Sequence, residues 1–184
     1  MKLQITSDAY TKLWYFIREC DSEITGFGKV RKQTIDDEDI LEIYDIEIFQ
    51  QEVSGTHATL DDEALATFLA DKVRNGEDIA SYRVWWHSHV NMEAFFSSID
   101  TGTIELSREF PYLISIVGNK PGQFKSRIDI FQPLRFTQDL TLEISDDENL
   151  LEWVKEEIAQ KVEQRVIPLS GLTGQHTWHV PDDA

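Results

Sequence analysis

Hydrophobic and polar positions along the chain follow two different periods, which separate the expected helices from the expected strands. Residues 8–20 carry apolar side chains every three or four positions, as in an amphipathic helix, with Ser7 as its expected N-cap. Residues 2–5 predict a short strand before that helix. Residues 40–49 alternate with period two, which predicts a strand with one buried face. That strand and the extended segment before it are expected to form a hairpin around the acidic turn 36–39.

The second half of the chain continues the alternation of helices and strands. A helix is expected over about 60–75, and another from near Ser97 to a point before Pro111. Apolar runs and period-two segments predict strands at 82–88, 112–117 and 125–131, with an extended stretch at 134–144. This order predicts an α/β domain in which a mixed sheet is flanked by helices.

The last readable helix is expected over about 146–165. It follows a capping box formed by Ser145 and Glu148. Its apolar stripe is expected to lie on the buried side of the helix and consists of Leu151, Val154, Ile158 and Val162. We expect one catalytic domain over 1–166 and a tail over 167–184. The tail carries His176, Trp178 and His179, for which an ordinary surface is favoured over a metal site because no third ligand accompanies the histidines.

Composition limits the classes of partner. The 184 residues are 41% hydrophobic and 28% charged, which fits a globular domain and excludes disorder over the whole length. Seventeen basic residues face thirty-four acidic ones, a net charge of -17 that argues against nucleic acid and against anionic membranes as partners. Cys20 is the single cysteine, so an intramolecular disulfide and a thiolate-rich zinc site are excluded. Without a signal-like start or a membrane-length apolar run, we expect a cytoplasmic protein.

One segment combines residues that suit metal chemistry. His87 and His89 fall on one face of an expected strand, so both imidazoles can reach one ion. Ser97 and Asp100 lie one turn apart on the following helix. Two histidines and one carboxylate leave the fourth position of a tetrahedral ion open, as in catalytic zinc sites. Each residue alone has an ordinary structural explanation, but the four together should coincide in on the order of one chain in a few thousand.

The spacing His-x-His-x7-Ser-x2-Asp resembles the signature of the JAMM (MPN+) zinc metalloprotease family. The segment Ala94-Phe95-Phe96-Ser97-Ser98-Ile99-Asp100 is similar to the Ala-Phe-Leu-Ser-Ser-Val-Asp stretch of some members. Upstream, Glu23-Ile24-Thr25-Gly26 is similar to the family's glutamate element. The resemblance covers about residues 1–145 and implies a three-layer MPN fold, related to that of cytidine deaminases. Val90 stands where many members have proline.

The resemblance also implies a role for each residue. His87, His89 and Asp100 would bind one zinc ion, Glu23 would act as general acid and base, and Ser97 would donate a hydrogen bond to the oxyanion. Separately from the resemblance, the position of the loop beside the metal leads us to expect that Met92, Glu93 and Phe95 contact substrate, with Phe95 or Phe96 anchoring the helix. The expected reaction is hydrolysis after the C-terminal glycine of a ubiquitin-like modifier or its conjugate. Two alternatives stay open: processing of a small sulfur-carrier protein or peptide conjugate by the same chemistry, and a non-catalytic MPN scaffold.

Overall fold

The fold is described from a computed structural model, which covers residues 1–51, 53–54, 57–58, 62–145 and 148–161. The chain forms two compact units, Met1–Asp146 and Asp147–Ala184, and each is described by itself. Among the described residues, no helix is both long and apolar enough to cross a membrane.

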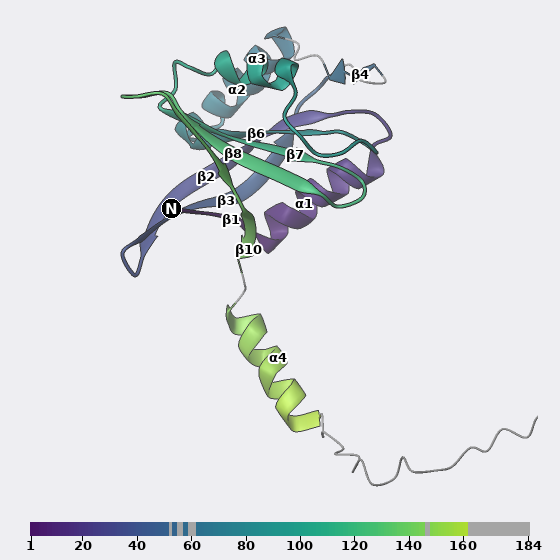
Figure 1. The fold of residues 1–184 in the computed structure, drawn as a ribbon, viewed down its shortest axis with the longest axis vertical. Helices are drawn as coiled ribbons and strands as arrows, with labels where there is room; N and C mark the ends of the chain where they lie inside the picture. The colour runs from purple at the N-terminus through teal and green to yellow at the C-terminus, as the bar shows by residue number, and fades with distance from the viewer. Residues whose placement is uncertain (52, 55–56, 59–61, 146–147, 162–184) are drawn as a thin grey trace, which may run out of the picture. The chain divides into compact units, whose positions relative to one another are not determined.

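The first unit is built on an eight-stranded mixed sheet with the order β10-β1-β3-β2-β6-β7-β8-β9 (Figure 1). The pairs β10–β1, β1–β3 and β6–β7 are parallel and the others antiparallel. The two edge strands, β9 and β10, are separated in sequence by Thr141 alone, so the sheet curls back on itself. The strands are β1 (Lys2–Thr6), β2 (Thr25–Ile35), β3 (Glu38–Ile48), β6 (Tyr82–Ser88), β7 (Tyr112–Gly118), β8 (Phe124–Ile130), β9 (Phe136–Leu140) and β10 (Leu142–Ser145). A separate two-stranded ladder pairs β4 (Val53–Ser54) with β5 (His57–Ala58).

Helix α1 (Ser7–Glu19) covers one face of the sheet. Its residues Leu13 and Ile17 are fully buried in the larger core cluster, which also contains Trp86 from β6. The expectation of Ser7 as N-cap is wrong by one residue. The Thr6 side chain accepts the hydrogen bond from the Ala9 backbone N–H, because the last residue of β1 already has the extended conformation that an N-cap requires.

The opposite face carries α2 (Asp62–Arg74), the short 3₁₀-helix η1 (Ile79–Ser81) and α3 (Ser98–Glu105). Trp85, Ile104 and Leu113 form a second, smaller buried cluster beneath α3. The Phe68 ring of α2 stacks on that of Phe27, with ring centroids 6.4 Å apart. Helices on both faces of a mixed sheet agree with the predicted α/β class.

An ion-pair network connects α2 and the segment after it to the sheet. Lys29 Nζ lies 2.7 Å from Glu77 Oε2 and 3.0 Å from Glu47 Oε1, and Lys72 pairs with both glutamates. The Tyr82 hydroxyl donates to Glu47 Oε1 at 2.6 Å. Hydrogen bonds from Lys29 and then from Lys72 lower the pKa of Glu77 from 4.5 to about 2.

The predicted strands at 82–88, 112–117 and 125–131 are confirmed within a residue or two as β6, β7 and β8. The extended stretch 134–144 forms two strands, β9 and β10. The first pairs with β8 up to Leu140, and the second pairs with β1 from Leu142 onward. The helix expected from near Ser97 to a point before Pro111 is confirmed as α3, which ends at Glu105 and is followed by turns.

The second unit is described from helix α4 (Glu148–Lys161). Its predicted buried stripe is not buried within this unit, because Val154 and Ile158 are 36% and 54% exposed. Periodicity predicts which residues share one face of a helix, but it does not by itself make that face buried. The side chains of Leu151 and Val162 and the whole tail 167–184, with His176, Trp178 and His179, lie outside the described residues.

Candidate metal centre

The centre of the candidate site lies at the carboxyl end of β6. This strand is central in the sheet, between β2 and β7, so its end is enclosed by neighbouring segments on both sides. His87 and His89 project to the same side, as the two-residue period predicts, and both are buried. Their Nε2 atoms are 3.2 Å apart. The strand therefore directs two imidazole nitrogens toward one point.

Asp100 reaches the same point from the first turn of α3. Its Oδ1 lies 3.1 Å from His87 Nε2, and its Oδ2 lies 4.0 Å from His89 Nε2. The three buried residues each offer one ligand atom, and these atoms lie within 4.8 Å of one another. The structure thus brings together the two histidines and the aspartate that the sequence spacing singled out.

Asp100 is held in place by the start of its own helix. Ser97 is the N-cap of α3, and its Oγ accepts from the Asp100 backbone N–H at 3.2 Å. The Asp100 carboxylate accepts in turn from the Ser97 backbone N–H at 2.6 Å. This reciprocal capping box restricts the carboxylate to one orientation. The predicted helix start near Ser97 is confirmed.

Three influences determine the pKa of Asp100. Burial raises this pKa, but the His87 imidazole and the hydrogen bonds from Ser97 lower it more, so the net direction is downward from 3.8. Asp100 is therefore ionised at neutral pH. The cluster offers one anionic oxygen together with two imidazole nitrogens.

The backbone carbonyl of Glu93 fixes the orientation of the His89 ring. Its Nδ1 lies 2.9 Å from the Glu93 carbonyl oxygen, and because a carbonyl oxygen only accepts, Nδ1 carries the hydrogen. The lone pair of a neutral His89 is then on Nε2, toward His87 and Asp100. A metal-binding histidine is usually held in this way. Sequence reasoning assigned Glu93 to substrate contact and missed this role of its backbone carbonyl.

His87 is positioned by stacking. Its ring lies on the Trp85 indole with centroids 4.6 Å apart and an interplanar angle of 24°. The indole is fixed by the hydrogen bond that its Nε1 donates to Thr25 Oγ1 at 2.8 Å. His87 Nδ1 is buried and has no hydrogen-bond partner among the described residues.

The donor spacing fits a tetrahedral ion. With ligands at about 2.0–2.1 Å, two ligand atoms of a tetrahedral zinc site are about 3.3 Å apart. The distances of 3.1 Å and 3.2 Å from His87 Nε2 to its two neighbours lie near that value. Two nitrogens and one carboxylate oxygen are also donors that Zn²⁺ accepts readily. A metal ion could therefore be held here with a modest adjustment of the His89–Asp100 pair.

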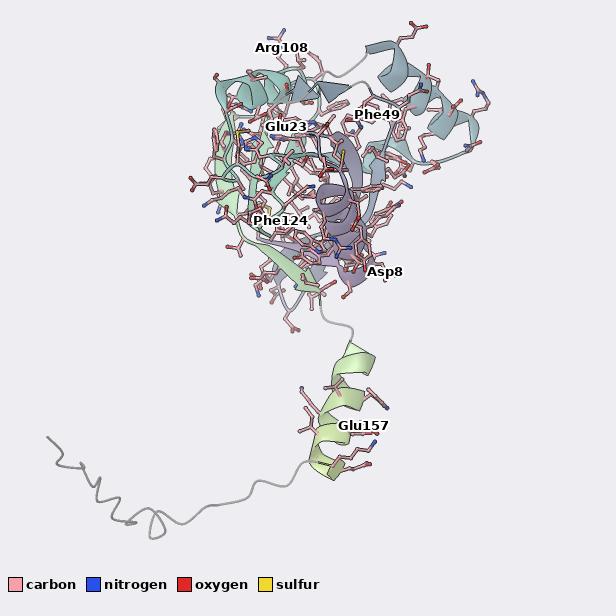
Figure 2. All side chains as sticks on the ribbon, turned by 90° about the vertical axis from the view of Figure 1, so that its right-hand side faces the viewer. Asp8, Glu23, Phe49, Arg108, Phe124 and Glu157 are labelled. Carbon is pink, nitrogen blue, oxygen red and sulfur yellow. The ribbon has the colours of Figure 1, made fainter. Side chains whose placement is uncertain are left out.

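Glu23 is half-buried and is labelled in Figure 2. It comes just before β2, whose first residue, Thr25, stands opposite His87 in the antiparallel ladder. Ile24 extends this alignment, because its carbonyl accepts from the Ser88 N–H at 2.9 Å and its N–H donates to Ser88 Oγ at 3.1 Å. These two hydrogen bonds hold Ile24 at the end of β6, and Glu23 is the residue directly before it.

The loop between the strand and α3 contains the predicted substrate contacts. Met92, Glu93 and Phe95 are exposed, and the Phe95 ring meets the His89 ring edge-on at 5.0 Å. Phe96 packs instead against the smaller core cluster and beneath Arg127, whose guanidinium lies 4.7 Å from its centroid. Phe96 thus anchors the loop, which leaves the side chains of the other three accessible.

Two features of this loop were not predicted. Asn119 is buried in the turn after β7, and its Nδ2 donates a hydrogen bond to the Met92 carbonyl at 2.7 Å. This bond connects the loop to that turn. Asparagine within the sequence Gly118-Asn119-Lys120-Pro121 is a turn signal that could have indicated such a role. Val90 adopts a φ of 46°, a left-handed conformation that a β-branched residue rarely takes. Proline, with φ near -65°, cannot adopt it.

Fold and site together define a mixed α/β protein with a buried His–His–Asp group that could hold a metal ion. Comparison with models of known protein families finds no match for this chain, and comparison with curated protein sequences finds none. The likeness to the JAMM family therefore rests on the motif residues themselves.

Proposed function

We propose that this protein is a zinc-dependent metalloprotease or isopeptidase of the JAMM type with the corresponding MPN fold. The observation that carries the proposal is the convergence of His87, His89 and Asp100, which the chain separates into a strand and a helix. Two imidazole nitrogens and one carboxylate oxygen that converge within 4.8 Å of one another make up the three protein ligands typical of a catalytic zinc site, which favours a metal ion over a packing role.

The zinc ion would supply a Lewis acid and lower the pKa of a bound water toward neutrality. His87 and His89 would hold it through Nε2 and Asp100 through its carboxylate. Ser97 Oγ accepts a hydrogen bond from the Asp100 N–H, and the hydroxyl also interacts with the Asp100 carboxylate. During the reaction the hydroxyl hydrogen would turn from that carboxylate to a developing oxyanion. One hydroxyl can thus cap the helix and assist the reaction.

Glu23 would accept the proton of the attacking water and pass it to the departing amine. The antiparallel alignment of β2 and β6 supports this role. Thr25 stands opposite His87, and the alternation of side chains gives Glu23 the same direction as Thr25 if the extended backbone continues by two residues. His89 lies two residues beyond His87 on the other strand, so the same alternation directs Glu23 to the metal side.

The substrate would be a ubiquitin-like modifier or its conjugate, cleaved after the C-terminal glycine. A hollow of about 460 Å³ adjoins the site and is lined by Phe95, Phe96 and residues of β8, β9 and β10. A narrow glycine-ended tail could lie in it and reach His89 past Phe95. Processing of a sulfur-carrier protein or of a small peptide conjugate uses the same chemistry and stays the second candidate. The intact ligand set disfavours a scaffold that has lost catalysis.

Cleavage assays on a panel of fusions test the proposal. The panel contains ubiquitin-like and sulfur-carrier proteins that end in Gly-Gly and are joined to a reporter through a peptide or an isopeptide bond. We expect zinc-dependent release of at least one reporter, loss of release with a chelator and recovery on zinc addition. The matched control is Asp100→Asn, which should be inactive. Zinc uptake without cleavage of any fusion would support the scaffold alternative, and no zinc uptake would refute the metal site.

A further inference from the structure

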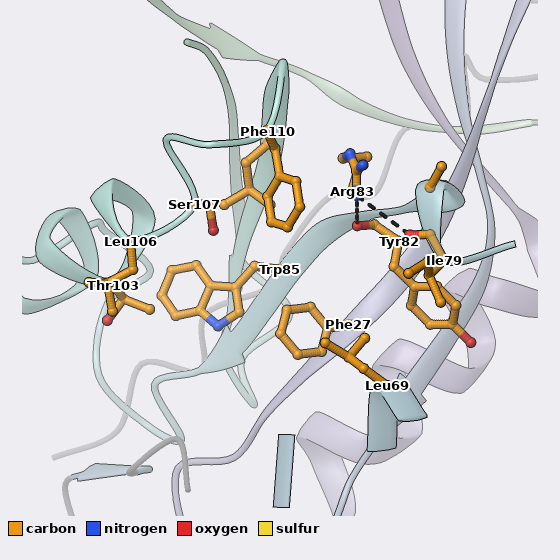
Figure 3. A pocket seen from close by; sticks show the side chains of 12 residues that line it. Phe27, Leu69, Ile79, Tyr82, Arg83, Trp85, Thr103, Leu106, Ser107 and Phe110 are labelled. Atoms are coloured by element: carbon orange, nitrogen blue, oxygen red, sulfur yellow. Dashed lines mark hydrogen bonds between the residues drawn. The ribbon is translucent and has the colours of Figure 1, made fainter. Parts of the chain in front are cut away.

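A second cavity lies beside the metal cluster, under α3. It has a volume of about 520 Å³, and its lining includes residues of η1 and of α3 (Figure 3). Aromatic and aliphatic side chains make up most of its wall, chiefly Phe27, Trp85, Leu106, Phe110 and Leu113. This volume lies in the range of small-molecule pockets, and pockets of that kind are mostly apolar with a few polar groups.

Arg83 is the one charged residue among the described residues that line this cavity. Its guanidinium lies over the Phe110 ring, 4.3 Å from the centroid. Nη1 donates to the Tyr82 carbonyl at 2.9 Å and makes a longer hydrogen bond of 3.5 Å to the Ile79 carbonyl (Figure 3). Nε and Nη2 make no hydrogen bond or ion pair with the described residues, so their donors remain available to an anion. A single cation at an apolar wall is conspicuous in a chain of net charge -17.

The cavity shares a wall with the metal cluster. Trp85 lines it and also stacks on His87 at 4.6 Å, and the indole is 5% exposed. A molecule that packs on Trp85 would thus contact a side chain that positions a metal ligand. The hydrogen bond from Trp85 Nε1 to Thr25 Oγ1 holds the indole against His87, so a ligand that packs on the indole changes the surroundings of the His87 ring.

From the cavity, Arg83 and the shared Trp85 we infer that this is a binding site for a small amphipathic monoanion. Its ligand has a flat apolar body and one carboxylate or sulfonate. The body packs against Trp85, Leu106 and Phe110, and the anion pairs with the free donors of Arg83. Occupancy alters the environment of His87 through the indole. The site is separate from the groove proposed for the protein substrate, and its binding does not depend on zinc.

Binding is tested with two fluorescent probes of nearly the same shape. One is 8-anilinonaphthalene-1-sulfonate, which carries one negative charge, and the other is N-phenyl-1-naphthylamine, which carries none. We expect saturable binding of both to the folded full-length protein with one site per chain. Arg83→Gln should weaken the sulfonate about tenfold and leave the neutral probe unchanged, since it removes one charge-assisted interaction. Arg108→Gln is the matched control, because Arg108 is 74% exposed and lies outside the cavity wall.

Ser107→Trp should abolish binding of both probes by filling the cavity, provided that near-ultraviolet circular dichroism shows native packing. If that variant is not folded, Leu106→Gln replaces it, because Leu106 is 80% exposed and contributes an apolar wall. It should weaken both probes. No saturable binding, equal loss in Arg83→Gln and Arg108→Gln, or unchanged binding in the filled or Leu106→Gln protein would overturn the assignment.

The link to His87 is tested in metal-free protein, so that its outcome is independent of the zinc chemistry. Long-range ¹H–¹⁵N spectra report the imidazole nitrogens of each histidine. Titration with the sulfonate probe should shift the His87 signals, assigned with a His87→Gln variant, in proportion to occupancy. The shift should disappear in Arg83→Gln at probe concentrations that leave that variant unoccupied. Saturated binding with unmoved His87 signals would overturn the link.

Discussion

Ser97 and Asp100 each satisfy the other's backbone N–H: Asp100 accepts from Ser97 at 2.6 Å, and Ser97 Oγ accepts from Asp100 at 3.2 Å. Both are also residues to which we assign metal or oxyanion chemistry. A substitution at either position therefore changes helix stability and function together, and only variants that preserve the cap can separate the two.

Two variants of Asp100 separate its role in zinc binding from its role in the helix cap. Asp100→Asn keeps an oxygen that can accept from the Ser97 N–H but removes the negative charge, whereas Asp100→Ala loses both. We expect both variants to lose at least tenfold in zinc affinity, measured by competition with a chromogenic chelator. Only Asp100→Ala should also lose about 1 kcal/mol of unfolding free energy in urea, through the lost capping interaction. Wild-type zinc affinity in both variants would exclude Asp100 as a ligand.

Two variants of Ser97 separate its proposed oxyanion contact from its role as N-cap. Ser97→Ala should reduce kcat about 10²–10³-fold and the unfolding free energy by about 1 kcal/mol. Ser97→Gly is an acceptable N-cap without a hydroxyl donor or a charge, so it should lose only about a few tenths of a kcal/mol of stability and still lose activity. The measurements are turnover on a cleavable fusion and urea unfolding. An active Ser97→Gly protein would contradict the proposed oxyanion contact.

Glu23 separates metal binding from proton transfer. Glu23→Gln keeps the size of the side chain but removes its basicity. Zinc content should stay near that of the wild type, whereas kcat falls by roughly 10²–10⁴. KM should change little, because the lost step is proton transfer. Full activity would make Glu23 dispensable, and lost zinc would make it a ligand instead.

The ion-pair network around Glu77 predicts a stability change in acid. Lys29 and Lys72 lower the pKa of Glu77 from 4.5 to about 2, so its contribution is complete above pH 4.5 and is lost as the pH falls toward 2. Glu77→Gln should therefore lower Tm at neutral pH, and its difference from the wild type should shrink across that window. The control is Glu109→Gln, whose side chain is 86% exposed. A constant difference at all pH values would contradict the assigned pKa.

Val90 predicts an effect of backbone strain. Val90→Gly should raise the unfolding free energy by about 0.5–1 kcal/mol, because relief of the left-handed strain exceeds the added entropy of the unfolded chain. Val90→Pro should lower it by about 2 kcal/mol or more, since proline cannot reach a φ of 46°. Val90→Ala, which keeps a Cβ without branching, is the intermediate control in urea unfolding. A proline variant as stable as the wild type would show that the loop adopts another conformation.

The sequence by itself determined most of the local structure and the composition of the candidate site. The two-residue period placed His87 near the end of β6 and His89 just after it on the same side, and helix-start chemistry placed Ser97 at the beginning of α3 with Asp100 one turn later. These relationships depend on neighbours within about four residues, so strand and helix geometry is enough to predict them.

Only the tertiary structure decided which distant groups meet. The stacking of Trp85 on His87, the Asn119 hydrogen bond to the loop and the carbonyl of Glu93 behind His89 depend on exact side-chain conformations and on the course of loops. The alignment that brings Glu23 to the end of β6 depends on strand register. A shift of that register by one residue would turn the Glu23 side chain to the opposite face of the sheet. The apolar stripe of α4 is a further feature whose packing could not be predicted from local sequence. Periodicity predicted the stripe, but burial requires a packing surface that the helix's own sequence does not specify.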